Sequence, residues 1–145
     1  MRAGLLIQES VEINAPLKNV WENFIDLTCW GQWNTVMQNV LSREEQLTRG
    51  EKIHCSFRPF FFPVRVKISV EEVIPFERVV WSAKKKGLTA YHEFHFTSNG
   101  TAVMVTSSET FTGVLARGRG VLLPKGKLKS LIRDFLSDLK RAAEG

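Results

Sequence analysis

Two polar residues interrupt strand faces that are otherwise apolar, and they are the best candidates for chemistry. His92 alternates with Phe94, and Glu109 alternates with Ser107 and Phe111, so each shares a strand face with its apolar neighbours. Burying an unpaired charge is costly, so these side chains need partners. One interpretation is structural, with His92, Glu109 and Ser107 paired to each other. The other is that they orient the polar end of a ligand in an apolar pocket, or act as acid and base if the protein is an enzyme.

Other kinds of catalytic site find little support. Tyr91 and His95 lie close to His92 in the sequence, but adjacent strand positions face opposite sides, so His92 and His95 are not expected to share a cavity. The sequence contains no nucleophile elbow, no glycine loop for phosphate and no metal-ligand spacing. Cys29 and Cys55 suggest reduced thiols in apolar surroundings. We therefore expect no metal, no cofactor and, more simply, binding without catalysis.

Composition indicates an ordinary globular protein. The chain has 145 residues, of which 43% are hydrophobic and 24% charged, and we expect residues 1–145 to form a single domain. It lacks the run of about 20 apolar residues that a membrane-spanning helix needs, and its start does not resemble a signal peptide, so a cytoplasmic location is expected. Oligomeric state does not follow from the sequence.

The net charge of +5 does not by itself indicate a nucleic-acid partner. The tight cluster Lys84-Lys85-Lys86-Gly87 is typical of a solvated turn between two strands. The stretch Arg117-Gly118-Arg119-Gly120 occurs as a single copy, which is weak evidence for RNA or DNA binding. No nucleic acid is expected as a partner.

The periodicity predicts one strand, two short helices, about six more strands and one long amphipathic helix. Asn99-Gly100 is a strong hairpin signal between the last two strands. The expected ranges are a strand over 5–13, helices over 16–24 and 26–33, strands over 36–42, 51–57, 64–73 and 78–83, two strands within 88–111, and a helix over 126–145. The apolar stripe of that helix must pack on the sheet.

These elements carry the motif IxAPxxxVWxxFxDLxxWxxWN between Ile13 and Asn34, followed by Arg78-Val79-Val80-Trp81 and by His92-x-Phe94-x-Phe96. In this order they resemble the START-like (SRPBCC) superfamily, which includes birch-pollen allergens, START lipid-transfer domains and aromatic polyketide cyclases. The resemblance implies an α+β helix-grip fold, in which a curved antiparallel sheet of about seven strands wraps a long C-terminal helix and encloses a cavity.

The resemblance and the inward strand faces together predict a protein that binds a hydrophobic small molecule or lipid. Two alternatives remain open: a polyketide cyclase- or dehydratase-like acid–base enzyme using His92 and Glu109, and a protein-interaction module like family members that assist chaperones or ribosomes. The candidate ligand-binding residues are Trp33, Phe57, Phe60, Phe62, Val66, Trp81, His92, Phe94, Ser107, Glu109, Phe111, Leu115 and Leu122.

Two loops are expected at the cavity mouth. In RPFFFP, prolines flank Phe60–Phe62 and disfavour a central strand there. At least one of these phenylalanines is expected to turn inward, and the others are then available for transient contact with a membrane or a partner. Glycine and proline within 113–126 predict that the long helix starts late or breaks near Pro124, with the preceding segment as a flap.

Overall fold

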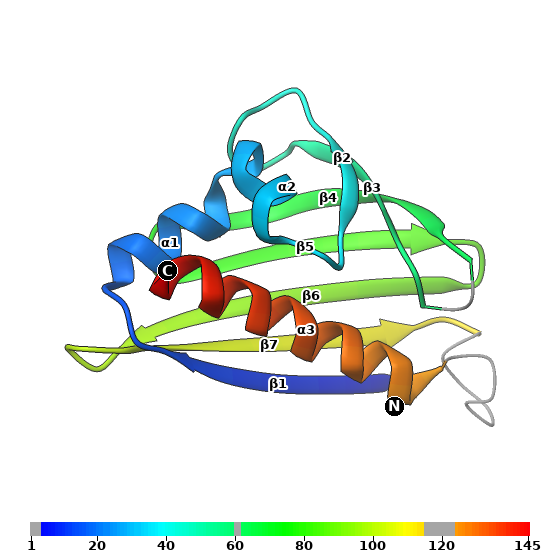
Figure 1. Cartoon of the computed structure of the whole chain (residues 1–145). Helices are drawn as coiled ribbons and strands as arrows, with labels where there is room; N and C mark the ends of the chain where they lie inside the picture. Colours follow the sequence, from blue (N-terminus) through cyan, green and yellow to red (C-terminus); the bar gives the residue numbers. More distant parts are fainter. Residues whose placement is uncertain (1–3, 60–61, 115–123) are drawn as a thin grey trace.

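The computed structural model describes residues 4–59, 62–114 and 124–145, and is built on one curved antiparallel sheet (Figure 1). The sheet has seven strands in the order β1-β7-β6-β5-β4-β3-β2. The strands are β1 (Leu5–Ile13), β2 (Gln38–Leu41), β3 (Lys52–Phe57), β4 (Val64–Ile74), β5 (Arg78–Lys85), β6 (Leu88–Ser98) and β7 (Val103–Thr112). The order follows from consecutive hairpins between β2 and β7, with β1 added beside β7.

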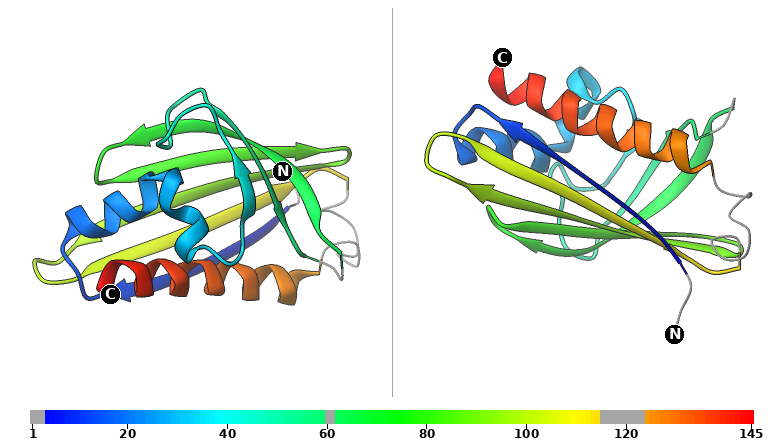
Figure 2. Two further views of the ribbon diagram at one scale, coloured as in Figure 1. Left: turned by 45° about the horizontal axis from the view of Figure 1, so that its top comes forward. Right: turned by 90° about the horizontal axis from the view of Figure 1, so that it is seen from below.

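The helices cover one face of this sheet (Figure 2). They are α1 (Leu17–Ile25), the 3-10 turn η1 (Leu27–Cys29), α2 (Trp30–Trp33) and the long α3 (Lys125–Glu144). The helix-grip fold predicted from the sequence is confirmed. Within the described residues, no helix is both long and apolar enough to cross a membrane.

The second helix and the second strand differ from their predicted boundaries, whereas the start of the long helix agrees with the prediction. The helix expected over 26–33 is divided, because the Asp26 carboxylate accepts the Thr28 N–H at 2.9 Å and caps η1 before α2 begins. The strand expected over 36–42 is shortened to Gln38–Leu41, which includes Asn39 at a φ of 55°. The long helix begins at Lys125, directly after Pro124, as the late-start prediction had it. Residues 115–123, where a flap was expected, lie outside the described residues.

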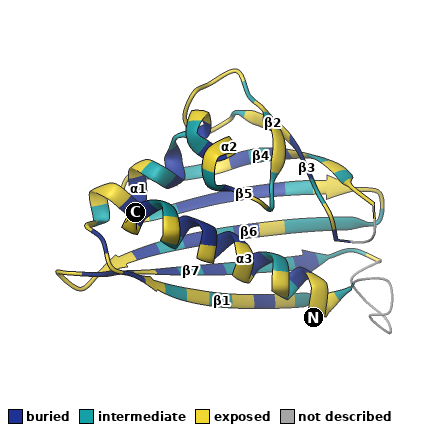
Figure 3. Ribbon diagram, in the orientation of Figure 1, coloured by how far each residue is buried: buried dark blue, intermediate teal, exposed yellow. Residues whose placement is uncertain are grey.

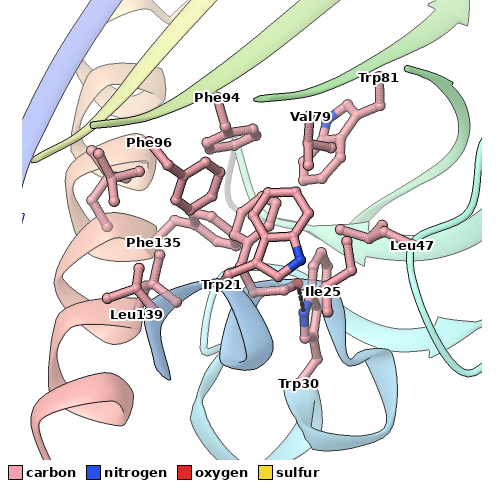
Figure 4. Packing of buried hydrophobic residues seen from close by; sticks show 14 of the residues in the cluster. Trp21, Ile25, Trp30, Leu47, Val79, Trp81, Phe94, Phe96, Phe135 and Leu139 are labelled. Atoms are coloured by element: carbon pink, nitrogen blue, oxygen red, sulfur yellow. Dashed lines mark hydrogen bonds between the residues drawn. The ribbon is translucent and has the colours of Figure 1, made fainter. Parts of the chain in front are cut away.

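An aromatic cluster fills one half of the space between α3 and the sheet (Figure 4). Phe24 of α1 lies at its centre, with its ring centroid 4.9 Å from that of Phe94 and 6.0 Å from that of Phe135 on α3. Trp30 is also buried, and its indole N–H donates to the Phe24 carbonyl at 3.0 Å. Because an indole N–H needs a partner when buried, this bond fixes α2 against α1.

The two faces of α3 differ in burial along the whole helix (Figure 3). Leu128, Ile132, Phe135 and Leu139 are buried toward the sheet, whereas Arg133 is exposed. Spacings of three and four residues place these apolar side chains on one stripe. The helix is therefore held on the sheet by a continuous apolar face.

A buried carboxylate also attaches α3 to the loop between α2 and β2. Asp138 is only 2% exposed and accepts two hydrogen bonds from Thr35, from the backbone N–H at 2.9 Å and from Oγ1 at 2.7 Å. Beside it, the Asn34 side-chain oxygen accepts the N–H groups of Val36 and Met37 at 3.0 and 2.8 Å. This loop therefore has a defined shape and a fixed position on the helix.

We predict that Asp138→Ala lowers the free energy of unfolding by about 1–3 kcal/mol, because it removes the two hydrogen bonds that Thr35 donates to the buried Asp138 carboxylate. Urea unfolding measures the loss. Asp134→Ala is the matched control, since Asp134 is exposed on the same helix. Equal stability of the two variants would contradict an anchoring role for Asp138.

Candidate functional site

A cavity of about 310 Å³ lies between the sheet and the first half of α3. Its volume falls at the lower end of the range of about 300–1,000 Å³ that small-molecule sites occupy. The described residues that line it are predominantly apolar: Val36, Met37, Cys55, Phe57, Pro59, Val64, Val66, Ile68, Trp81, Ala83, Lys85, Leu88, Ala90, His92, Phe94, Glu109, Phe111, Pro124, Leu128, Leu131, Ile132 and Phe135.

The β6–β7 hairpin places His92 and Glu109 side by side on the cavity wall. They are directly opposite each other in the strand register, and His92 Nδ1 lies 3.6 Å from Glu109 Oε2. The other ring nitrogen, Nε2, lies 2.5 Å from Oγ of Ser107, which is completely buried. The His92 ring also stacks on Phe94 with centroids 4.1 Å apart and meets the Trp81 ring edge-on. The Ser107 hydrogen bond and the contacts with Phe94 and Trp81 therefore hold the imidazole in one orientation.

Burial keeps this pair uncharged. It lowers the pKa of His92 from 6.5 to about 3 and raises the pKa of Glu109 from 4.5 to about 8, because the apolar surroundings disfavour both charged forms. At neutral pH the cavity wall thus presents a neutral imidazole beside a protonated carboxylic acid. Such a pair can donate and accept hydrogen bonds, or donate and accept a proton, without a net charge.

The described residues offer little support for a nucleophilic cysteine or a metal site. Burial raises the pKa of the Cys55 thiol to about 12, so the thiolate needed for a nucleophile is not formed at neutral pH. Among residues 4–59, 62–114 and 124–145, no cluster of three His, Cys, Asp or Glu side chains could hold a metal ion.

Seven of the candidate residues predicted from the sequence line the cavity. They are Phe57, Val66, Trp81, His92, Phe94, Glu109 and Phe111. Ser107 lies behind His92 and contributes its hydrogen bond rather than a wall contact.

The remaining candidates lie elsewhere or are not described. Trp33 does not line the cavity, because its ring packs on Trp30 and Phe135 with centroids 5.9 and 5.6 Å away and joins the aromatic cluster. Phe62 is 58% exposed and is not part of the described lining. Phe60, Leu115 and Leu122 lie outside the described residues.

Sequence reasoning missed a cation in the cavity wall. Lys85 belongs to β5 rather than to the turn, and it lines the cavity. The period of two from Trp81 through Ala83 to Lys85 was the available signal, but the cluster of three lysines before Gly87 favoured a solvated turn. The wall contributed by α3 was likewise not among the predicted site residues; it consists of Leu128, Leu131, Ile132 and Phe135.

Comparison with known proteins agrees with this geometry. The family model described as polyketide cyclase/dehydrase and lipid transport matches residues 5–144. The chain belongs to this family. No curated protein matches the sequence significantly.

Several solved structures share the fold of this family member at low sequence identity. The di-domain ARO/CYC protein BexL of the BE-7585A biosynthetic pathway has a TM-score of 0.78 and 18% identity over 99% of this chain, which spans 51% of BexL. Norcoclaurine synthase of Thalictrum flavum has a TM-score of 0.71 and 13% identity, with 97% of this chain and 96% of that chain covered. Major latex-like protein 151 of Panax ginseng has a TM-score of 0.76 and 10% identity, with 96% and 97% covered.

The neutral state of Glu109 makes stability depend on pH. The folded state keeps the Glu109 proton up to about pH 8, whereas the unfolded chain loses it near 4.5, so this residue reduces stability as pH rises between these values. Burial of neutral His92 has the opposite effect, because it makes stability increase as pH rises from about 3 to 6.5. We therefore predict a plateau between pH 4.5 and 6.5 and a decline from 6.5 to 8.

The Glu109→Gln variant should not lose stability between pH 6.5 and 8. Its free energy of unfolding should increase relative to that of the wild type by at most about 1.4 kcal/mol per pH unit between pH 4.5 and 8. Urea unfolding at several pH values checks this. Glu93→Gln, on the outer face of the same hairpin, should follow the wild-type profile. A difference between Glu109→Gln and the wild type that does not change with pH would exclude a neutral buried Glu109.

Proposed function

We propose that this protein binds a hydrophobic small molecule in the cavity between the sheet and α3. The observation that carries the proposal is the apolar cavity of about 310 Å³ whose wall contains a few placed polar groups, among them His92, Glu109 and Lys85. Apolar walls stabilise a ligand by about 25 cal/mol per Å² removed from water, and sparse polar groups fix its orientation. The large side chains of Phe57, Trp81 and Phe94 border this space and do not fill it.

The family supports the same proposal. Its description joins polyketide cyclases and dehydrases to lipid transport, and a lipid is an apolar molecule that a cavity of this kind can shield from water. The similar structures include an ARO/CYC protein and a norcoclaurine synthase, which are examples of this fold in enzymes. Because those likenesses are below 25% identity, they support an enclosed site without identifying its ligand.

A second candidate function is acid–base catalysis, and the pairing of His92 with Glu109 favours it. A neutral imidazole can remove a proton from a bound molecule while the neighbouring carboxylic acid donates one, and both groups face the same cavity. Ser107 would then be a positioning residue, since its hydrogen bond sets which nitrogen of His92 faces Glu109. Liquid chromatography with mass spectrometry of the released ligand separates the candidates: a carrier returns an added ligand unchanged, whereas an enzyme alters its mass or its isomer composition.

We predict that Ala90→Phe weakens ligand binding by occupying part of the cavity. Ala90 lines the wall opposite Ala83 and Phe111 in the strand register, where a ring added to its Cβ enters the space that a ligand needs. Titration with the uncharged fluorescent dye N-phenyl-1-naphthylamine should show saturable binding to the wild type. The variant should bind at least about tenfold more weakly, a difference of about 1.4 kcal/mol.

Thr97→Phe is the matched control, because Thr97 is exposed near the other end of the same strand. It should bind the dye like the wild type. Thermal melting of both variants shows whether they are folded. If folded Ala90→Phe binds the dye as well as the wild type, the dye does not occupy the cavity and the proposed function fails.

A further inference from the structure

Lys85 gives one end of the cavity a positive charge. It lies on the inner face of β5, two positions beyond Ala83, and faces Leu88 across the hairpin that joins β5 to β6. Within the part of the chain that the structure describes, Lys85 forms no ion pair. Its ammonium group is therefore available to a ligand that enters this end.

The N-terminus of α3 adds to the positive electrostatic potential at the Lys85 end of the cavity. The β5–β6 turn and the first turn of α3 lie at the same end of the molecule (Figure 1 and Figure 2). Pro124 and Leu128 line the cavity there, and no described side chain caps the helix N-terminus. Unpaired N–H groups and the helix dipole favour an anion at such an end. Lys85 is itself exposed to solvent at this end, as is Lys86 of the neighbouring turn.

The opposite pole of the cavity is uncharged. Glu109 is the carboxyl group in the described wall, and it lies beside His92 rather than beside Lys85. Trp81, which is opposite His92 in the register, is four residues from Lys85 along β5, or about 13 Å at about 3.3 Å per residue. Burying a charged ligand group at this apolar pole without a counterion is unfavourable, whereas a hydroxyl or carbonyl group can exchange hydrogen bonds with it.

We infer that the ligand is an anionic amphiphile whose acid group pairs with Lys85 at one end of the cavity, while an uncharged hydroxyl or carbonyl group meets His92 and Glu109 at the other. This inference rests on the proposed function and specifies its ligand class. The apolar body of the molecule lies between the two poles, against Ala83, Ala90 and the first half of α3.

Competition for the bound dye N-phenyl-1-naphthylamine tests the anionic end. Decanoate should displace the dye from the wild type at a concentration about fivefold lower than decanol, because only the acid pairs with Lys85. Lys85→Met keeps most of the apolar side chain and removes the charge, so decanoate and decanol should displace the dye from this variant at similar concentrations. Lys84→Met is the matched control, since the adjacent strand position faces away from the cavity, and it should keep the preference.

A third competitor tests the uncharged pole. ω-Hydroxydecanoate should displace the dye at a concentration a few times lower than decanoate, and Glu109→Leu should remove that advantage. Equal displacement by decanoate and decanol, or a preference that persists in Lys85→Met, overturns the anionic end. Equal displacement by the two acids overturns the uncharged pole. Failure of the wild type to bind the dye overturns the proposed function itself, so the two kinds of failure are distinguishable.

Discussion

The packing of Phe135 against the rings below it determines how α3 lies over the sheet. Its centroid is 5.5 Å from that of Phe94 and 6.0 Å from those of Phe24 and Trp30, so large aromatic side chains separate the second half of the helix from the sheet. Beyond this cluster the sheet face carries smaller side chains, among them Ala83 and Ala90. A stiff helix cannot bend into the space above them, and the cavity results from this difference in side-chain size along the sheet.

The cavity is chemically asymmetric because the β5–β6 and β6–β7 pairs bring different residues to its two ends. Near the β5–β6 turn, Lys85 and Leu88 are opposite each other, whereas further along β6 the neighbours are Trp81, His92 and Glu109. At the uncharged pole, the β6–β7 strand pairing and the hydrogen bond to Ser107 hold His92 and Glu109, so that their positions do not depend on loops. This arrangement suits recognition of a molecule with distinct ends, and it suits proton transfer at one of them.

Sequence periodicity was sufficient for the strand faces and for seven of the described residues in the cavity wall. The alternation around Asn99-Gly100 predicted that His92 and Glu109 lie on a shared apolar face, and the register makes them direct neighbours. It failed for Trp33, whose ring joins Trp30 and Phe135 because α2 turns it toward the aromatic cluster. It also failed for Lys85, because local composition near Gly87 indicates a turn while the strand pairing extends to Lys85.

By itself, the sequence determined the order of elements and the apolar face of each element, since these depend on periods of 2 and 3.6 residues and on local turn chemistry. The helix-grip fold was implied by the resemblance of its motifs to the START-like superfamily. Only the tertiary structure decided which side chains meet. The distance from His92 to Glu109, the neutral state that burial gives both, the place of Lys85 and the volume left beside Phe135 all depend on contacts between distant segments. Such contacts are set by packing against several elements at once, and no local pattern encodes that.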